Sequence, residues 1–452
     1  MEREIPPHDA VFGYDFLGNL QNRKEGSPMG NDNKLGTKIK GQVSRFCQDI
    51  TEGMNKPRKE FFKETMYGMM ASEDVKLSEV ARSLGEPIKL IKTEGRLSRQ
   101  MSSVDCTGWI NEVLIEKAGW QIGKETVIAV DLTSIAKRYG KKMEALGYAW
   151  DGMEKQAVKG YEICEAIAAE VKGQRVIPLY SELYSTAMEG YESENKQILK
   201  AVDGVMEVVG QEKGIYVIDR GGDRKALLEG LLARGAMFVI RAMGNRHINV
   251  EEEKQSILEA ARGLRCRYWR EVTVETKEGL REKKVLHIGV REITLRFWSK
   301  PINLVVIKGW NKDKPMMLLT NLEIADREDF AQKVLEIYLT RWKCEEGFRF
   351  IKQSYRLEDV RVRSLNGLRN TVMFVHMIFY FISVVLGQRL KMSILLMKLC
   401  QKALRFFEIP SFKQYAIADG IYRVLFGRRF GNREPSEPVF EDQGYLPLTF
   451  AL

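Results

Sequence analysis

Cysteine and histidine are scarce in this sequence. Its 452 residues include six cysteines, none of them in a CxxC pair, and four histidines, no two of which are spaced as metal ligands on one element. Cysteines this few and this scattered exclude a disulfide framework and a zinc ribbon. They fit a reducing compartment, so we expect a cytoplasmic protein. Zinc enzymes and serine-type triads are disfavoured because both depend on histidine.

Long apolar runs are also rare. The N-terminal residues contain no apolar stretch of the secretory type, so we expect no secretory signal. The segment 370–388 carries no charged residue and approaches the length of a membrane-spanning helix. It is interrupted by His376 and Ser383 and flanked by Asn370 and Gln388. We therefore expect a buried core helix and no membrane partner.

The charge balance is positive. Lys and Arg number 71 and Asp and Glu number 61, which gives a net charge of +10. This excess favours an anionic partner, nucleic acid before a membrane surface. Many soluble enzymes are mildly basic, so charge alone does not decide the partner. The hydrophobic share of 44% excludes a disordered chain.

Apolar residues follow helical spacing in some segments and form strand-like runs in others, which predicts an α/β protein with helical regions at both ends. Residues 77–99 resemble a helix-turn-helix, although a plain helical hairpin with a basic face explains the pattern as well. The predicted parts are a flexible arm at 1–36, a helical DNA-binding domain at 37–120, the first part of the core at 121–243, a β-rich insertion at 244–325, the final core helix at 326–364, and a C-terminal helical region at 365–452, which is a candidate for dimerisation.

Two aspartates end apolar runs that are typical of buried strands. Asp131 follows "VIAV" and Asp219 follows "GIYVI". Ligands meet an α/β sheet at strand ends, and paired carboxylates there are typical ligands of Mg²⁺. An Asp in this position can equally cap the next helix.

A predicted helix in 326–364 carries a sharper pattern. Tyr338, Arg341, Glu345 and Lys352 fall within about 60° of one another on a helical wheel. One carboxylate flanked by two cations and a phenol suits a metal-bound phosphate. The alternative is a solvated face with Arg341 and Glu345 as an i,i+4 ion pair.

The spacing Tyr338-x2-Arg341-x3-Glu345-x6-Lys352 resembles the Y-x2-R-x3-E-x6-K signature of a group of bacterial insertion-sequence transposases of the DDE type. The blocks around Asp131 and Asp219 are similar to the aspartate blocks of that family, and they occur in the same order. The β-rich insertion before the glutamate, ending in an "LLTN" strand, is a further likeness. The resemblance covers about residues 120–365.

The resemblance implies an RNase H-like catalytic core and a DDE triad of Asp131, Asp219 and Glu345. The triad would bind two Mg²⁺ ions, with Mn²⁺ as a substitute. Tyr338, Arg341 and Lys352 would contact DNA phosphates, and Arg241 and Arg246 are further candidates. The implied activity is cleavage of double-stranded DNA at the terminal inverted repeats of a mobile element, followed by strand transfer into target DNA. A homodimer on DNA is expected, in the bacterial cytoplasm and at the nucleoid.

Two other functions remain open at this point. A two-metal nuclease or resolvase on the same fold would cut DNA without joining it. An inactive relative would only bind DNA. Where some relatives carry a base-flipping Trp, this sequence reads "PMMLLTN", so a hairpin intermediate also remains open.

Overall fold

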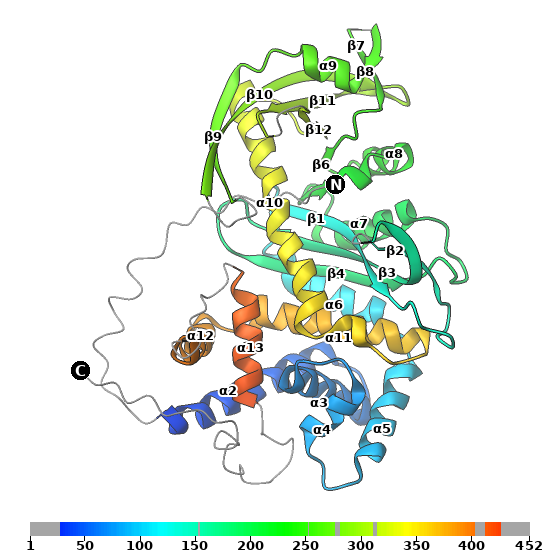
Figure 1. The fold of residues 1–452 in the computed structure, drawn as a ribbon, viewed down its shortest axis with the longest axis vertical. Helices are drawn as coiled ribbons and strands as arrows, with labels where there is room; N and C mark the ends of the chain where they lie inside the picture. Colours follow the sequence, from blue (N-terminus) through cyan, green and yellow to red (C-terminus); the bar gives the residue numbers. More distant parts are fainter. Residues whose placement is uncertain are drawn as a thin grey trace, which may run out of the picture.

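The structure, a computed structural model of the chain, describes residues 28–151, 154–251, 253–275, 281–310, 314–402 and 412–425. A twisted sheet occupies the centre and one end of the molecule, and a layer of helices forms the other end (Figure 1). The long helix α10 crosses the sheet and links the two ends (Figure 1).

The N-terminal helices begin earlier than the sequence predicts. Helix α2 starts at Pro28, so residues 28–36 are helical rather than part of a flexible arm, and residues 1–27 lie outside the described residues. Proline is well tolerated in the first turn of a helix, and the buried Leu35 and Ile39 anchor α2 to the core. The helices of this region are α2 (Pro28–Ile50), α3 (Lys56–Ser72), α4 (Leu77–Leu84), α5 (Leu90–Ser103) and α6 (Thr107–Gly119).

Five strands of the central sheet run in the order β4-β3-β1-β5-β6. The β4, β3 and β1 strands pair antiparallel, whereas β1, β5 and β6 pair parallel. The elements of this part are β1 (Val127–Ala136), β2 (Gly147–Asp151), β3 (Gln156–Ala169), β4 (Val176–Tyr184), α7 (Glu194–Val209), β5 (Ile215–Ile218), η1 (Arg220–Gly222), α8 (Lys225–Ala233) and β6 (Phe238–Arg241).

The β-rich insertion extends this sheet. Its last strand pairs antiparallel with β6 on one side and with β11 on the other, so the insertion continues the hydrogen-bonded ladder of the core. Its elements are β7 (His247–Val250), β8 (Glu253–Ser256), α9 (Ile257–Gly263), β9 (Tyr268–Glu275), β10 (Arg281–Leu295), β11 (Trp298–Lys308) and β12 (Met316–Thr320).

The C-terminal helices pack against the N-terminal ones. The rings of Phe61 in α3 and Phe374 in α11 meet edge to face with centroids 5.5 Å apart. The remaining elements are α10 (Arg327–Ser354), η2 (Leu357–Asp359), α11 (Leu365–Tyr380), η3 (Phe381–Val385, one turn of π-helix), α12 (Gln388–Lys402) and α13 (Lys413–Leu425).

The apolar segment at Leu365–Val385 is long enough to cross a membrane, but 78% of its apolar 18-residue window is buried inside the protein. This is the environment of a core helix, as the sequence predicts.

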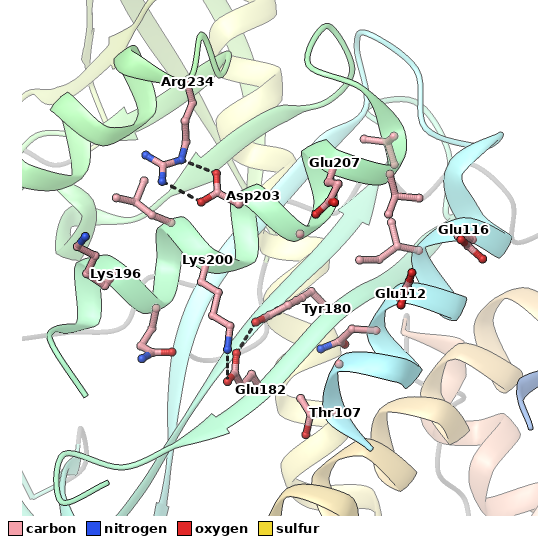
Figure 2. Close-up of a pocket in the computed structure, with 18 of the residues that line it drawn as sticks. Thr107, Glu112, Glu116, Tyr180, Glu182, Lys196, Lys200, Asp203, Glu207 and Arg234 are labelled. Carbon is pink, nitrogen blue, oxygen red and sulfur yellow. Dashed lines mark hydrogen bonds and ion pairs between the residues drawn. The ribbon is translucent and has the colours of Figure 1, made fainter. Parts of the chain in front are cut away.

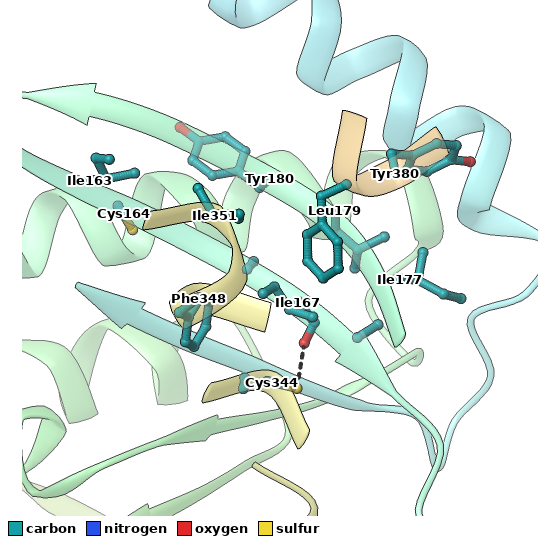
Figure 3. Close-up of a cluster of buried hydrophobic side chains, with 14 of the residues drawn as sticks. Ile163, Cys164, Ile167, Ile177, Leu179, Tyr180, Cys344, Phe348, Ile351 and Tyr380 are labelled. Atoms are coloured by element: carbon teal, nitrogen blue, oxygen red, sulfur yellow. Dashed lines mark hydrogen bonds between the residues drawn. The ribbon is translucent and has the colours of Figure 1, made fainter. Parts of the chain in front are cut away.

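Helix α10 is held on the sheet by an apolar stripe. Cys344, Phe348 and Ile351 pack onto β3 beside Ile163 and Ile167 (Figure 3). The Cys344 thiol donates a hydrogen bond to the Ile167 carbonyl oxygen at 3.4 Å. This packing fixes the rotation of α10, and thereby the direction of the polar residues beside the stripe.

Candidate active site

Strands β1 and β5 bring Asp131 and Asp219 side by side. The strands pair in parallel, with Ala129 opposite Val217 as the last paired residues. Each aspartate follows two positions later, so the register places the two carboxylates next to each other. The prediction that both residues end a strand is correct for Asp219 and wrong for Asp131. Antiparallel pairing with β3 carries β1 on to Ala136.

Local hydrogen bonds orient both carboxylates. Asp131 Oδ1 accepts from the Leu132 amide at 2.9 Å. Asp219 Oδ1 accepts from the Gly221 amide at 2.6 Å, which caps η1.

Helix α10 supplies Glu345 together with a buried cation. Arg341 Nη1 lies 2.5 Å from Glu345 Oε1, one helical turn away. The Arg341 guanidinium is buried and lies over the rings of Tyr338 and Trp342, 5.5 and 5.3 Å from their centroids. Its Nε has no hydrogen-bond partner among the described residues. A fixed guanidinium with a spare donor is suited to binding a phosphate oxygen.

The charges of these side chains act on one another. Burial raises the pKa of Asp131, the Asp219 charge raises it further, and Arg341 lowers it. Burial also raises the pKa of Glu345, where Arg341 opposes the effect and Asp219 adds to it. Burial alone would lower the pKa of Arg341, but Tyr338 and the three carboxylates hold it above its ordinary value. Asp131, Asp219, Glu345 and Arg341 therefore form one electrostatic cluster.

The other two residues of the signature lie at different depths on α10. Tyr338 is only 1% exposed, and its hydroxyl has no partner among the described residues. Lys352 is more accessible, and its Nζ lies 3.0 Å from Glu358 Oε1, just beyond the end of α10. The one-face arrangement predicted for the helix thus places Tyr338 deep in the protein and Lys352 near its surface.

The two further arginine candidates are separate from this cluster. Arg246 donates from Nε to Asp223 Oδ1 at 2.6 Å, and its guanidinium lies 5.7 Å from the centre of the Phe297 ring. Arg241 is the last residue of β6 and already has an interaction within the chain. Their contact with DNA stays a prediction, and for Arg246 it would require competition with Asp223.

Sequence reasoning missed a buried acid beside Asp131. Glu165 lies directly opposite Asp131 in the β1–β3 ladder, so both side chains are on the same face of the sheet. Burial raises the pKa of Glu165 to about 8. One of its oxygens accepts from the Ser181 hydroxyl at 3.1 Å, and the other has no partner among the described residues. The signal was visible in "CEAIAAE", where a charged residue interrupts an apolar strand.

The donor chemistry of the cluster suits a hard cation. Within the described residues, no three His, Cys, Asp or Glu side chains are arranged as a ready metal site. Glu345 is instead directed toward Arg341. The mutual repulsion of the three carboxylates is nevertheless the kind of charge that a divalent cation relieves, and Mg²⁺ prefers carboxylate oxygens.

A cleft lies away from this cluster. It has a volume of about 1400 Å³ and is lined by α6, α7 and β4 (Figure 2). Its lining includes Glu182, which shares a sheet face with Cys164 and not with Asp131. Acidic side chains outnumber basic ones seven to five in this lining. A surface with this charge balance does not favour phosphate.

The family of the chain follows from comparison with known proteins. The family model described as transposase DDE domain matches residues 122–381, which is more than half of the chain. The chain therefore belongs to the transposase DDE domain family. No curated protein matches it. Membership supports a transposase-type function with DNA as substrate, and proteins of this family generally use divalent metal ions.

Proposed function

We propose that the protein is an insertion-sequence transposase of the Y-x2-R-x3-E-x6-K group that cleaves and joins DNA with Asp131, Asp219 and Glu345. The observation that carries the proposal is that Asp131 in β1 and Asp219 directly after β5 are neighbours in the strand register, and that both interact electrostatically with Glu345 and the buried Arg341 of α10. The strand order and directions of β4-β3-β1-β5-β6 support an RNase H-like core, with the insertion between β6 and α10.

Each residue of the cluster has a distinct role in this proposal. Asp131, Asp219 and Glu345 hold two Mg²⁺ ions, with Mn²⁺ as a substitute. When bound, these ions activate the attacking hydroxyl and stabilise the leaving oxygen. Arg341 and Tyr338 are the proposed ligands of oxygens of the reacting strand, through the unpaired Nε and hydroxyl groups. Both groups are buried in the DNA-free protein, so this binding requires the site to open. Lys352 leaves its ion pair with Glu358 and binds a backbone phosphate of the DNA.

The reaction sequence needs two DNA partners. Water first attacks the phosphorus at the end of the mobile element and releases a 3′-hydroxyl. That hydroxyl then attacks target DNA, and one phosphodiester bond forms as another breaks. Two element ends must be held together, so we propose a homodimer on DNA, acting in the bacterial cytoplasm at the nucleoid. The N-terminal helices α2–α5 are the proposed readers of the terminal inverted repeats.

A plasmid assay tests the proposal. The full chain is incubated with supercoiled plasmid carrying the DNA that flanks its gene, with and without Mg²⁺. We expect cuts at defined ends and joined products. The Glu345→Ala variant should lose both, whereas the matched Glu346→Ala variant, in which an outward pair with Arg349 is removed, should keep both.

The same assay separates the alternatives. Cutting without joining would support a nuclease or resolvase. Specific end binding without cutting would support an inactive DNA-binding relative. Equal cutting by the wild type and the Glu345→Ala variant would show that the assigned site is wrong.

A further inference from the structure

Three large aromatic side chains are exposed at one corner of the sheet. Tyr139, in the loop after β1, is 94% exposed, and Tyr148 and Trp150 on β2 are 61% and 59% exposed. Their neighbours Gly147 and Ala149 are buried, so Tyr148 and Trp150 project together from the outer side of β2. Apolar surface of this kind on a protein is usually covered by a partner.

The strand register puts Tyr148 and Trp150 on the same face of the sheet as the catalytic cluster. Tyr148 pairs with Lys159 of β3, and Asp131 pairs with Glu165 of β3. Lys159 and Glu165 are an even number of residues apart in one strand, so their side chains share a face. Six residues of strand span about 20 Å, which is the distance a DNA strand would cover between the two points.

Unpaired cations surround the aromatics. Lys141 and Lys142 lie in the loop after β1, and Lys159 faces Tyr148 across the β2–β3 pair. Arg361 and Arg363 lie on the connection between α10 and α11. All five side chains are exposed, and none has an ion-pair partner in the described part of the chain. The acids of the β2–β3 turn, Asp151 and Glu154, are by contrast occupied by Arg138.

Hydrogen bonds join this corner to the segment between η2 and α11 and to the first residue of α11. Lys137 Nζ donates to the Val360 carbonyl oxygen at 2.8 Å. The Glu144 amide donates to the Arg363 carbonyl oxygen at 2.9 Å, and Glu144 Oε2 accepts from the Leu365 amide at 2.7 Å. The backbone that carries the aromatics is thereby tied to the chain that follows the helix of Glu345.

We infer that this aromatic–basic platform, formed by Tyr139, Tyr148, Trp150 and the five cations, binds unpaired nucleotides of the DNA strand that passes through the catalytic cluster. Exposed rings stack on bases, and the cations bind the phosphates between them. Bases inside an intact duplex are not available for such stacking. The platform thus selects frayed or single-stranded DNA next to the cutting position. The inference rests on the proposed function because it takes DNA as the substrate.

The test compares two DNA ends. Fluorescence anisotropy in EDTA, where no cutting occurs, measures binding of the full chain to a labelled blunt duplex and to the same duplex with a six-nucleotide single-stranded extension, made in both polarities. We expect the wild type to prefer one extended duplex. In the double variant Tyr148→Ala/Trp150→Ala, the ratio of the affinity for the extended duplex to that for the blunt duplex should fall by about tenfold or more. The affinity for the blunt duplex should stay unchanged.

Matched variants control for folding and for charge. Trp120→Ala removes a Trp that is 80% exposed beside the acidic cleft and should behave as the wild type. Trp150→Phe keeps a ring and should retain most of the preference. Lys141→Gln/Lys142→Gln should lower the slope of log affinity against log salt by about 1 to 2.

The outcomes separate the two levels of the account. The inference about the platform is wrong if the wild type binds DNA without preferring an extension, or if the double variant retains that preference. Either result leaves the transposase proposal unaffected. If the wild type binds no DNA in either form while circular dichroism shows it folded, the proposed function fails and the platform fails with it.

Discussion

At the scale of single residues, repulsion between the carboxylates of the catalytic cluster lowers the stability of the metal-free protein. Asp131 interacts with the charges of Asp219 and Glu345 in a buried environment, and Arg341 is the main cation that offsets the three negative charges. Groups whose arrangement opposes stability are typical of functional sites, because binding of a cation or substrate later relieves the repulsion.

Asp131→Asn should therefore stabilise the metal-free protein. We expect a gain of about 1 kcal/mol at pH 8 in EDTA, together with loss of DNA cutting. Burial and the neighbouring charges raise the folded-state pKa of Asp131 to about 7, so the wild type loses stability as the pH rises from about 4 to about 7. The advantage of the variant should grow over that range and then level off. Urea unfolding measures this, with the exposed Asp49→Asn as control. A variant less stable than the wild type at pH 8 would contradict the account.

His376 in α11 predicts a different pH dependence. Its ring is fully buried, neither nitrogen has a partner among the described residues, and burial lowers its pKa to about 3. The unfolded chain takes up a proton near pH 6.5 and the folded chain does not, so stability falls as the pH drops below that value. His376→Leu should remove about 2 kcal/mol of the loss between pH 6.5 and pH 4.5, measured by chemical denaturation of both proteins. Parallel pH curves for the two proteins would contradict this assignment.

At the scale of elements, α10 depends on a close approach to the sheet. A Cβ added at Gly347 would lie 2.9 Å from Ile167 Cδ1 and 3.0 Å from the Phe379 ring. Neither neighbour is the free end of a flexible surface chain, since both are buried in the core. Gly347 is two residues from Glu345, so its contact sets the height of the carboxylate above the sheet.

Gly347→Ala should lower the rate of DNA cutting by at least about tenfold while the protein stays folded. The gain in helix propensity, about 1 kcal/mol, is opposed by overpacking of about 1–3 kcal/mol, so the net change in stability should be small or destabilising. Gly41→Ala in α2 meets no atom within 4 Å and should stabilise without affecting cutting. Single-turnover cutting and thermal unfolding measure the pair. Unchanged cutting by Gly347→Ala would show that the helix can move freely.

The sequence predicts this helix better than it predicts the strands. Helical periodicity places Tyr338, Arg341 and Glu345 on one face, and α10 has that face. The apolar stripe of Cys344, Phe348 and Ile351, which also follows helical spacing, is buried. The end of a strand, by contrast, is set by its partner: β1 continues past Asp131 because β3 pairs with it, and no local pattern contains that information. Glu165 stands out in the sequence as a charged residue in an apolar strand, but its position opposite Asp131 depends on the same strand pairing.

At the scale of the whole molecule, the two ends of the chain build one helical layer. Asn370 of α11 joins them. Its Nδ2 donates to the carbonyl oxygens of Met101 and Val104, both at 2.7 Å, and its Oδ1 accepts from the Cys106 amide at 2.9 Å. Asn370 is 2% exposed, so water cannot replace these bonds. Residues so far apart in sequence could not be paired from composition or spacing.

Asn370→Ala should destabilise the protein by about 2–4 kcal/mol, because three buried backbone groups lose their partner. The exposed Gln388→Ala, which also removes an amide, should change stability by less than about 0.5 kcal/mol. Urea denaturation monitored by tryptophan fluorescence gives both values. Equal stability of the two variants would show that the helical layer does not depend on this junction.

The central claim is that Asp131, Asp219 and Glu345 act as one metal site. The most direct test is a Mn²⁺ titration followed by electron paramagnetic resonance, using the full chain bound to its end DNA. The wild type should bind Mn²⁺, and Asp131→Asn, Asp219→Asn and Glu345→Gln should each weaken binding by about tenfold or more, whereas Glu346→Gln should bind as the wild type. Equal binding by all five proteins would contradict the claim.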